Sequence, residues 1–255
     1  MNEPFIISMA RSKAPGRLED IIAAALWAFA DAGYDRTKIA HVAARAGVGP
    51  GTVYLYAEDK EALFELVLLR SLESPVVSHP SLPYRKTDRA ARTRLIDECL
   101  HEVAHFPQLW IGTQRRTYDG AIEEYVGILL EMARWFRRYR AAILLAQRNR
   151  YDWPELSEAF DRVVWSDVQR RLASFLTSRM RAGALAVVGD PGLVARFAVD
   201  ALVSGLVAGP VSGSTPERPG DEGVLVTLIA ASVRLPAEVD PEPDPAARAE
   251  SPGDL

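Results

Sequence analysis

Two short helical patterns separated by a glycine-containing turn constrain this chain more than any other feature. The first pattern has an apolar face with the helical period, formed by Ile39, Val42, Ala43 and Ala46. It ends at Gly47, and only two residues separate that glycine from Pro50, a residue type favoured at the first position of a helix. Two helices joined by so short a turn predict a helix-turn-helix.

The flanking residues predict two more helices around this pair. Residues 17–32 have apolar side chains on one face and end at Gly33, which can adopt a left-handed cap conformation. Thr37 offers a capping hydroxyl to the second helix. The third helix is expected over residues 50–56 and a fourth over residues 59–72, which completes a small helical domain.

The composition of the predicted third helix favours contact with DNA. Pro50 and Gly51 leave its first turn smooth, so it can enter a major groove about 12 Å wide with its terminal N–H groups near phosphate. Polar and aromatic residues follow, namely Thr52, Tyr54 and Tyr56. Lys60 comes one turn later and can reach the same DNA backbone.

The run from residue 17 to residue 68 resembles the N-terminal domain of the TetR family of bacterial transcriptional regulators. The residues that establish the resemblance are Ala24, Ala25, Phe29, Gly33, Tyr34, Thr37, Val42, Ala43, Gly47, Val48, Gly51, Thr52, Tyr54, Lys60, Glu61 and Leu63. The resemblance implies that Thr37, Tyr54 and Lys60 hold DNA phosphates. It also implies a set that faces the groove, consisting of Pro50, Gly51, Thr52, Leu55 and Tyr56, and Lys38 is a further candidate for DNA binding.

Three positions depart from the family pattern. Gly49 replaces a serine-like cap, Ala57 stands where phenylalanine is common, and Trp27 occupies a first-helix position that is usually polar. Few outward-facing residues have side-chain donors, so we expect Thr52, Tyr56 and contacts with thymine methyl groups to read the bases, with DNA shape contributing.

The length of 255 residues suggests two structural units. Residues 74–87 contain three prolines and no helical period, which predicts a boundary. Met9 is expected to be the biological start. The expected organisation is a flexible N-terminal arm at 1–16, the helix-turn-helix DNA-binding domain at 17–72, a connector at 73–87, a larger helical effector-binding and dimerisation domain at 88–235, and a disordered acidic tail at 236–255.

Composition argues against several other classes of protein. The apolar runs are too short to cross a bilayer, no secretory signal is visible, and Cys99 is the single cysteine. We therefore expect a cytoplasmic protein. The net charge of −4 argues weakly against nucleic acid, so the prediction of DNA binding depends on where the charges lie.

An enzyme is not expected from this sequence. It contains no nucleophile motif, P-loop or dinucleotide fingerprint. His41, His101 and His105 have no cysteine or carboxylate partners at ligand spacing, so surface or core histidines are the better interpretation. We expect no metal and no cofactor.

Aromatic residues are concentrated in the middle third of the chain, and such residues often line ligand pockets. The candidates for effector binding are His105, Trp110, Tyr118, Trp135, Tyr139 and Trp165. For any one of these aromatics, a place in the helical core remains the simpler interpretation.

The last two predicted helices, residues 191–209 and 222–234, suit a dimer interface. They combine large apolar residues with small ones that permit close approach, namely Leu193, Phe197, Ala201, Leu202, Gly205, Leu206, Leu225, Leu228 and Ile229. The family resemblance also implies such a homodimer. Two-fold symmetry would place the recognition helices about 34 Å apart on a pseudo-palindromic operator.

The leading hypothesis is a repressor that is released from its operator by a small apolar or aromatic effector. The alternative is a ligand-free DNA-binding protein whose helical body serves dimerisation or partner recruitment. A third hypothesis, an enzyme or small-molecule binder that retains the module only as a scaffold, is disfavoured by the presence of Thr37, Tyr54 and Lys60. Activation instead of repression stays open.

Overall fold

The structure is a computed structural model that describes residues 16–116, 119–187, 189–207 and 221–234. Within these ranges the regular elements are helices, apart from one antiparallel pair of two-residue strands, β1 (Ala186–Val187) and β2 (Val233–Arg234). The predicted all-α class is confirmed. The expected flexible arm, apart from its last residue, the expected acidic tail and Tyr118 lie outside the described residues.

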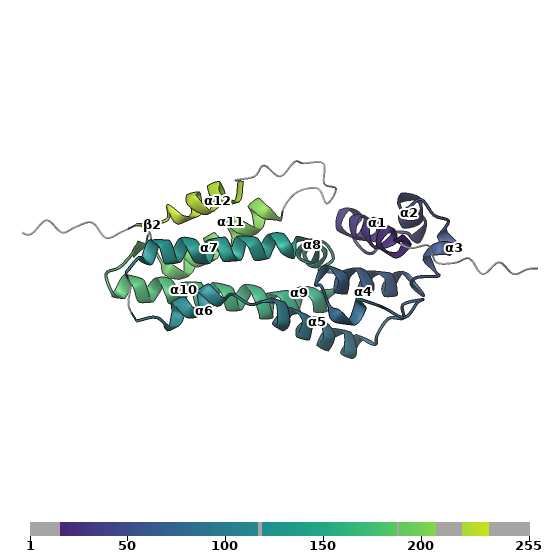
Figure 1. Cartoon of the computed structure of the whole chain (residues 1–255), viewed down its shortest axis with the longest axis horizontal. Coiled ribbons are helices and arrows are strands. Elements are labelled where there is room, and N and C mark those ends of the chain that lie inside the picture. Colours follow the sequence, from purple (N-terminus) through teal and green to yellow (C-terminus); the bar gives the residue numbers. More distant parts are fainter. Residues whose placement is uncertain (1–15, 117–118, 188, 208–220, 235–255) are drawn as a thin grey trace, which may run out of the picture.

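Four helices form the N-terminal domain, at one end of the elongated molecule (Figure 1). They are α1 (Arg17–Ala32), α2 (Ile39–Arg45), α3 (Pro50–Val53) and α4 (Lys60–Ser71). Phe29 of α1 meets Phe64 of α4 edge to face, with ring centroids 5.0 Å apart, and both side chains are fully buried. Because α2 packs on both α1 and α3, the predicted helix-turn-helix is present.

The rest of the described chain forms a larger helical body. Its helices are α5 (Arg89–Val103), α6 (Pro107–Gln114), α7 (Ala121–Arg138), α8 (Arg140–Arg148), α9 (Pro154–Phe160), α10 (Ser166–Arg181), α11 (Pro191–Leu206) and α12 (Asp221–Ala230). The long helices α7 and α10 run along the body, α11 packs on both, and α12 lies on α7 (Figure 1). None of the described helices is long and apolar enough to span a bilayer.

A buried ion pair fastens three helices inside the body. The guanidinium of Arg179 is fully buried, and its Nη2 lies 2.7 Å from a carboxylate oxygen of Glu124. The same nitrogen donates to the Gly112 carbonyl at 2.8 Å, and the group lies 4.5 Å from the ring centroid of Phe175. A buried charge is tolerated only with such partners, so this arrangement links α6, α7 and α10.

Hydrogen bonds join the two domains at the turn between α1 and α2, residues 33–38, which we call the α1–α2 turn. Asn149, directly after α8, is almost fully buried, and its side-chain oxygen accepts the backbone N–H of Tyr34. The N–H of Asp35 donates to the Asp152 carboxylate at 3.2 Å, and the Arg148 guanidinium donates two hydrogen bonds to the carbonyl of Asp31, at the end of α1. The turn that precedes α2 is therefore held by the body.

Apolar contacts reinforce the same junction. Trp153, just before α9, is buried, with its ring centroid 4.3 Å from that of Phe64 and 5.7 Å from that of Tyr34. The guanidinium of Arg92, on α5, lies 4.1 Å from the same indole. The indole therefore packs between residues of the N-terminal domain and α5.

The segment between the domains returns to the helix-turn-helix. After a short 3₁₀ turn, η1 (Pro75–Val77), the chain reaches residues 82–87, which we call the strap. Tyr84 of the strap forms an isolated parallel bridge with Ala57, just beyond α3. The segment that was expected only to connect the two domains therefore also contacts the helix-turn-helix.

Candidate functional site

The exposed end of α3 forms a small protruding surface, which we call the recognition tip. It consists of Pro50, Gly51, Thr52, Tyr54 and Leu55. Tyr54 is 48% exposed and Leu55 39% exposed, whereas Val53, directly before them, is buried and anchors the helix to the core. A Cβ added at Gly51 would meet nothing within 4 Å, so the tip is open to a large partner.

Tyr56 corrects one sequence expectation. It was expected to face the groove, but its side chain is buried. The α3 helix ends at Val53 and not at residue 56, because the chain tightens into a turn in which the Tyr56 N–H donates to the Val53 carbonyl at 2.9 Å. This turn directs the Tyr56 ring inward, so the ring cannot read bases in this conformation.

Thr37 corrects a second expectation. It was expected to cap α2 and to hold a phosphate, but it is only 2% exposed. Its hydroxyl lies 2.7 Å from the Gly33 carbonyl and 3.1 Å from the Ala28 carbonyl. Lys38, which is exposed, takes the N-cap position of α2 without a side-chain bond. Thr37 therefore stabilises the end of α1 and the turn.

Lys60, the other predicted phosphate ligand, is directed toward the α1–α2 turn. Its ammonium donates to the carbonyls of Tyr34 at 3.0 Å and Asp35 at 3.2 Å. It also lies 4.3 Å from the ring centroid of Tyr34, whose pKa is raised by burial. Since Lys60 is half-buried and opens α4, it links the start of α4 to the turn before α2.

Trp27, the unusual residue of the first helix, lies on the outer side of the domain. The guanidinium of Arg45, at the end of α2, stacks 3.7 Å from the centroid of the Trp27 ring system. Arg45 is exposed and Trp27 half-buried. This cation–π contact fixes the end of α2 against α1.

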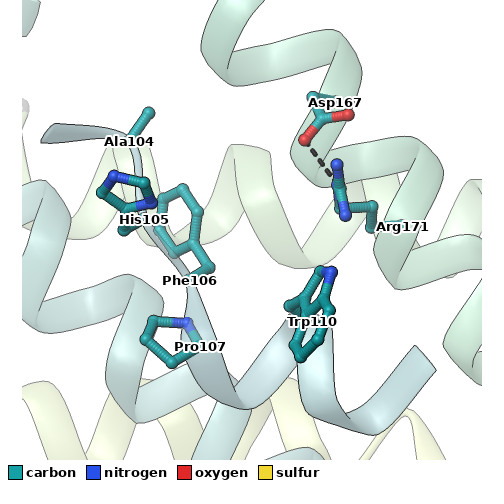
Figure 2. Close-up of a pocket in the computed structure, with 7 residues that line it drawn as sticks. All are labelled: Ala104, His105, Phe106, Pro107, Trp110, Asp167 and Arg171. Atoms are coloured by element: carbon teal, nitrogen blue, oxygen red, sulfur yellow. Dashed lines mark hydrogen bonds and ion pairs between the residues drawn. The ribbon is translucent and has the colours of Figure 1, made fainter. Parts of the chain in front are cut away.

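A cavity of about 400 Å³ lies between the start of α6 and α10. Its lining residues are Ala104, His105, Phe106, Pro107, Trp110, Asp167 and Arg171 (Figure 2). Figure 2 shows the ion pair of Asp167 and Arg171, with an N–O distance of 2.6 Å, above the ring of Trp110, and the rings of His105 and Phe106 on the opposite side. We call this space the α6–α10 cavity.

The five candidates for effector binding that the structure describes do not come together. His105 and Trp110 line the α6–α10 cavity. Trp135 and Tyr139 are buried, and the Trp135 indole N–H donates to the Val103 carbonyl at 2.6 Å. Trp165 is half-buried beside Phe136 and Phe160, and it lines two other pockets, away from the α6–α10 cavity. The expectation of an effector contact is therefore corrected for Trp135 and Tyr139, whose rings are buried in the core.

Comparison with known proteins identifies the N-terminal module. Residues 21–67 match the family model of bacterial regulatory proteins, tetR family, and this range includes the whole helix-turn-helix and the recognition tip. The N-terminal domain belongs to the tetR family. A search of curated protein sequences finds no match for the chain.

Solved structures resemble the chain over most of its length at low identity. A TetR-family regulator from Mesorhizobium loti is 20% identical with a TM-score of 0.38, over 85% of this chain and 92% of the other. FadR from Bacillus subtilis, in complex with stearoyl-CoA, is 15% identical with a TM-score of 0.41, over 85% and 99%. SmeT, repressor of the Stenotrophomonas maltophilia efflux pump SmeDEF, is 20% identical with a TM-score of 0.38, over 89% and 97%. These similarities are too distant to assign an effector.

The body behind the tetR-family domain exposes an apolar surface on its last two helices. Leu193 and Phe197 of α11 and Leu228 of α12 are each more than half exposed. The other expected interface residues differ in exposure. Gly205 is exposed, and Ala201, Leu206 and Leu225 are half-buried. Leu202 and Ile229 are buried within this chain. The expectation is corrected for these last two, which cannot reach a partner because they fill their own core.

Sequence reasoning missed the residues that brace the tetR-family domain from outside. Asn149 and Tyr84 are distant from the module in sequence, yet one holds the α1–α2 turn and the other adjoins the end of α3. Neither is part of a motif. The one sequence signal at this place is Ala57, which stands where the family commonly has the larger phenylalanine, and the backbone of Tyr84 lies beside it.

Proposed function

We propose that this protein is a transcriptional regulator that binds double-stranded DNA through the recognition tip. As a homodimer it would recognise a palindromic operator and act as a repressor that a small apolar or aromatic effector releases. The tetR-family domain supports the DNA-binding part. The proposed effector site and dimer surface are supported by the geometry of the body alone, and repression is taken from the leading sequence hypothesis.

One observation carries the proposal: the recognition tip is exposed and firmly supported. Tyr54 and Leu55 directly follow α3, whose Val53 is buried, and Thr37 and Lys60 hold the turn before α2, the helix on which α3 packs. A rigid protruding helix end with a smooth first turn fits the major groove. Tyr54 can then donate its hydroxyl to phosphate or a base edge.

The test is selection of bound sequences from random double-stranded DNA, followed by titration of the enriched site at one fixed salt concentration. We expect palindromic sites with the wild type. Tyr54→Ala should lower the affinity about 5- to 100-fold, as expected for loss of one important contact. Tyr151→Ala is the matched control, because Tyr151 is 87% exposed on the body, remote from the tip in sequence. Absence of any enriched site would reject the proposal.

Dimerisation would use the exposed apolar surface of α11 and α12. Large exposed apolar patches on a soluble protein mark interaction sites, and two helices from each subunit can form a four-helix interface. Phe197→Glu and Leu228→Glu should each shift the protein toward monomer in sedimentation velocity. Leu202 is buried within the chain, so Leu202→Val should leave the oligomeric state unchanged.

The α6–α10 cavity is the proposed effector site. Phe106 and Trp110 offer aromatic surface, and the pair of Asp167 and Arg171 offers polar contacts at its edge. Titration with naphthalene and 1-naphthoate, followed by tryptophan fluorescence and operator affinity, tests this assignment. Binding should be lost in Trp110→Ala. Unchanged operator affinity across a broad panel of apolar compounds would reject an effector.

One observation favours the ligand-free alternative. The centre of the body is filled by side chains, since Tyr125, Phe136, Phe160 and Phe175 are all buried. A protein of this kind would use its body for dimerisation or partner recruitment only. It predicts operator binding that depends on Tyr54 but does not respond to any compound in the panel.

A further inference from the structure

The backbone of the strap is hydrogen-bonded to the segment that directly follows α3, which is the recognition helix of the helix-turn-helix. The N–H of Tyr84 donates to the Tyr56 carbonyl at 2.8 Å, and the N–H of Glu58 donates to the Tyr84 carbonyl at 3.0 Å. Lys86 extends the contact, since its N–H donates to the Glu58 carboxylate at 3.1 Å. Because α3 has only four residues and ends at Val53, bonds to the segment that follows it at residues 56–58 restrict where its C-terminal end can lie.

The side chain of Tyr84 anchors the strap to α4. Its hydroxyl donates to the carboxylate of Glu65 at 2.7 Å, and Tyr84 itself is buried. Glu65 is fully buried and also accepts the hydroxyl and the N–H of Thr87, at 3.0 and 3.2 Å. Burial raises the pKa of Glu65. A buried carboxylate with three donors from one segment fixes that segment in place.

The strap leads directly into α5. Asp88 caps α5 by accepting the N–H of Ala91 at 2.9 Å. One turn later Arg92 forms ion pairs with Glu61 of α4 at 2.8 Å and with Glu155 of α9 at 2.7 Å. The position of the strap is therefore determined by both the tetR-family domain and the body.

We infer that the strap positions the recognition helix for DNA, with Tyr84 and Glu65 as its positioning residues. The inference rests on the proposed DNA-binding function. The small side chain of Ala57 permits it, because the strap backbone lies directly beside this residue. Loosening the strap leaves the recognition tip intact but lets its orientation vary, and a misoriented helix loses contacts with the groove.

The test compares Tyr84→Phe with wild type on the selected operator, at temperatures where circular dichroism shows both proteins fully folded. Loss of a hydrogen bond to a buried carboxylate should weaken operator binding about tenfold. Tyr125→Phe is the matched control, because it removes the hydroxyl of a buried tyrosine on α7. Glu65→Gln retains one oxygen acceptor and should lie between Tyr84→Phe and wild type.

Hydrogen exchange separates positioning from general destabilisation. In Tyr84→Phe the amide protons of residues 58 and 84 should exchange about tenfold faster, while those of α7 stay unchanged. Wild-type affinity in Tyr84→Phe, or uniformly faster exchange throughout the chain, would overturn the inference. Failure of the wild type to select any site would instead reject the proposed function, so the two failures are distinguishable.

Discussion

The recognition tip and the α6–α10 cavity differ in how well local sequence specifies them. At the tip, small residues and a proline lie at fixed positions within a short module, and Gly51, Tyr54 and Leu55 are exposed where expected. Around the cavity, aromatic residues were the single signal, and Trp135 belongs to the core. Small residues at fixed spacing identify the DNA-facing surface of a short helix. A high local content of aromatic residues, in contrast, does not show which of them line a pocket and which fill the core.

The two regions are also stabilised differently. The α1–α2 turn depends on hydrogen bonds from the side chains of Lys60 and Thr37 to backbone carbonyls. The body depends on the ion pair of Arg179 with Glu124, whose guanidinium is buried against the ring of Phe175. Substitutions in the body should therefore cost more stability than substitutions near the tip.

The largest expected effect comes from Arg179→Met. This change leaves the Glu124 carboxylate without its buried partner, so the free energy of unfolding should fall by about 3–5 kcal/mol. Urea unfolding monitored by circular dichroism measures it. Arg162→Met is the control, because Arg162 pairs with Asp97 on the surface and such pairs contribute less than about 1 kcal/mol. Equal losses in both variants would contradict the distinction between the regions.

Lys60→Met should have the next largest effect. The carbonyls of Tyr34 and Asp35 lose a charged donor, which should lower the free energy of unfolding by about 1.5–3 kcal/mol. The salt dependence of operator binding then identifies its role. A phosphate contact would reduce the slope of log affinity against log salt by about one, whereas a purely structural lysine would leave that slope unchanged.

Gly51→Ala should separate stability from DNA binding. The added methyl group meets no atom within 4 Å, and alanine in place of a helical glycine stabilises by about 0.5–1 kcal/mol. The same methyl group projects from the recognition tip, so operator affinity should fall. Thermal melting and titration of one preparation measure both. A more stable variant with unchanged affinity would show that Gly51 does not approach DNA.

The smallest expected effect is a pH dependence at α4. The hydrogen bond from Lys86 lowers the pKa of Glu61 in the folded protein. At pH values between this lowered pKa and the ordinary pKa of glutamate, the unfolded chain therefore binds more protons than the folded chain. Stability should therefore be lost as the pH falls through this window. Burial raises the pKa of Glu65, so its contribution has the opposite sign and falls as the pH rises above the ordinary value. Urea unfolding of Glu61→Gln and Glu65→Gln across this pH range separates the two.

Sequence alone could predict the helix-turn-helix because its signals are local. Gly47 and Pro50 bound the turn, and the apolar period around Val42 defines the packed face. The roles of Thr37 and Tyr56 could not be predicted, because burial of a polar or aromatic side chain depends on neighbours from other helices. The family pattern assigned both to DNA, and the hydrogen bonds of the turn and the strap place them inside.

Long-range contacts lay beyond prediction for the same reason. More than a hundred residues separate Asn149 from Tyr34, and the sequence between them contains no motif that links the two. Leu202 and Ile229 were indistinguishable from Leu193 and Leu228 in the apolar pattern of their helices. Only the packing of α11 and α12 shows that the first pair is buried and the second exposed.

The bonds at the α1–α2 turn set how often the two domains can change their relative orientation. Rotation there would break the hydrogen bonds that Asn149 and Asp152 make with the backbone of the turn and the two that Arg148 makes with the carbonyl of Asp31, at the end of α1. At about 0.5–1.5 kcal/mol each, these four bonds alone would keep the rotated form to between roughly one molecule in thirty and one in twenty-five thousand. A reorientation of the DNA-binding domain would then be a transition between two discrete populations, and any compound that shifts it must favour the minor one by a comparable free energy.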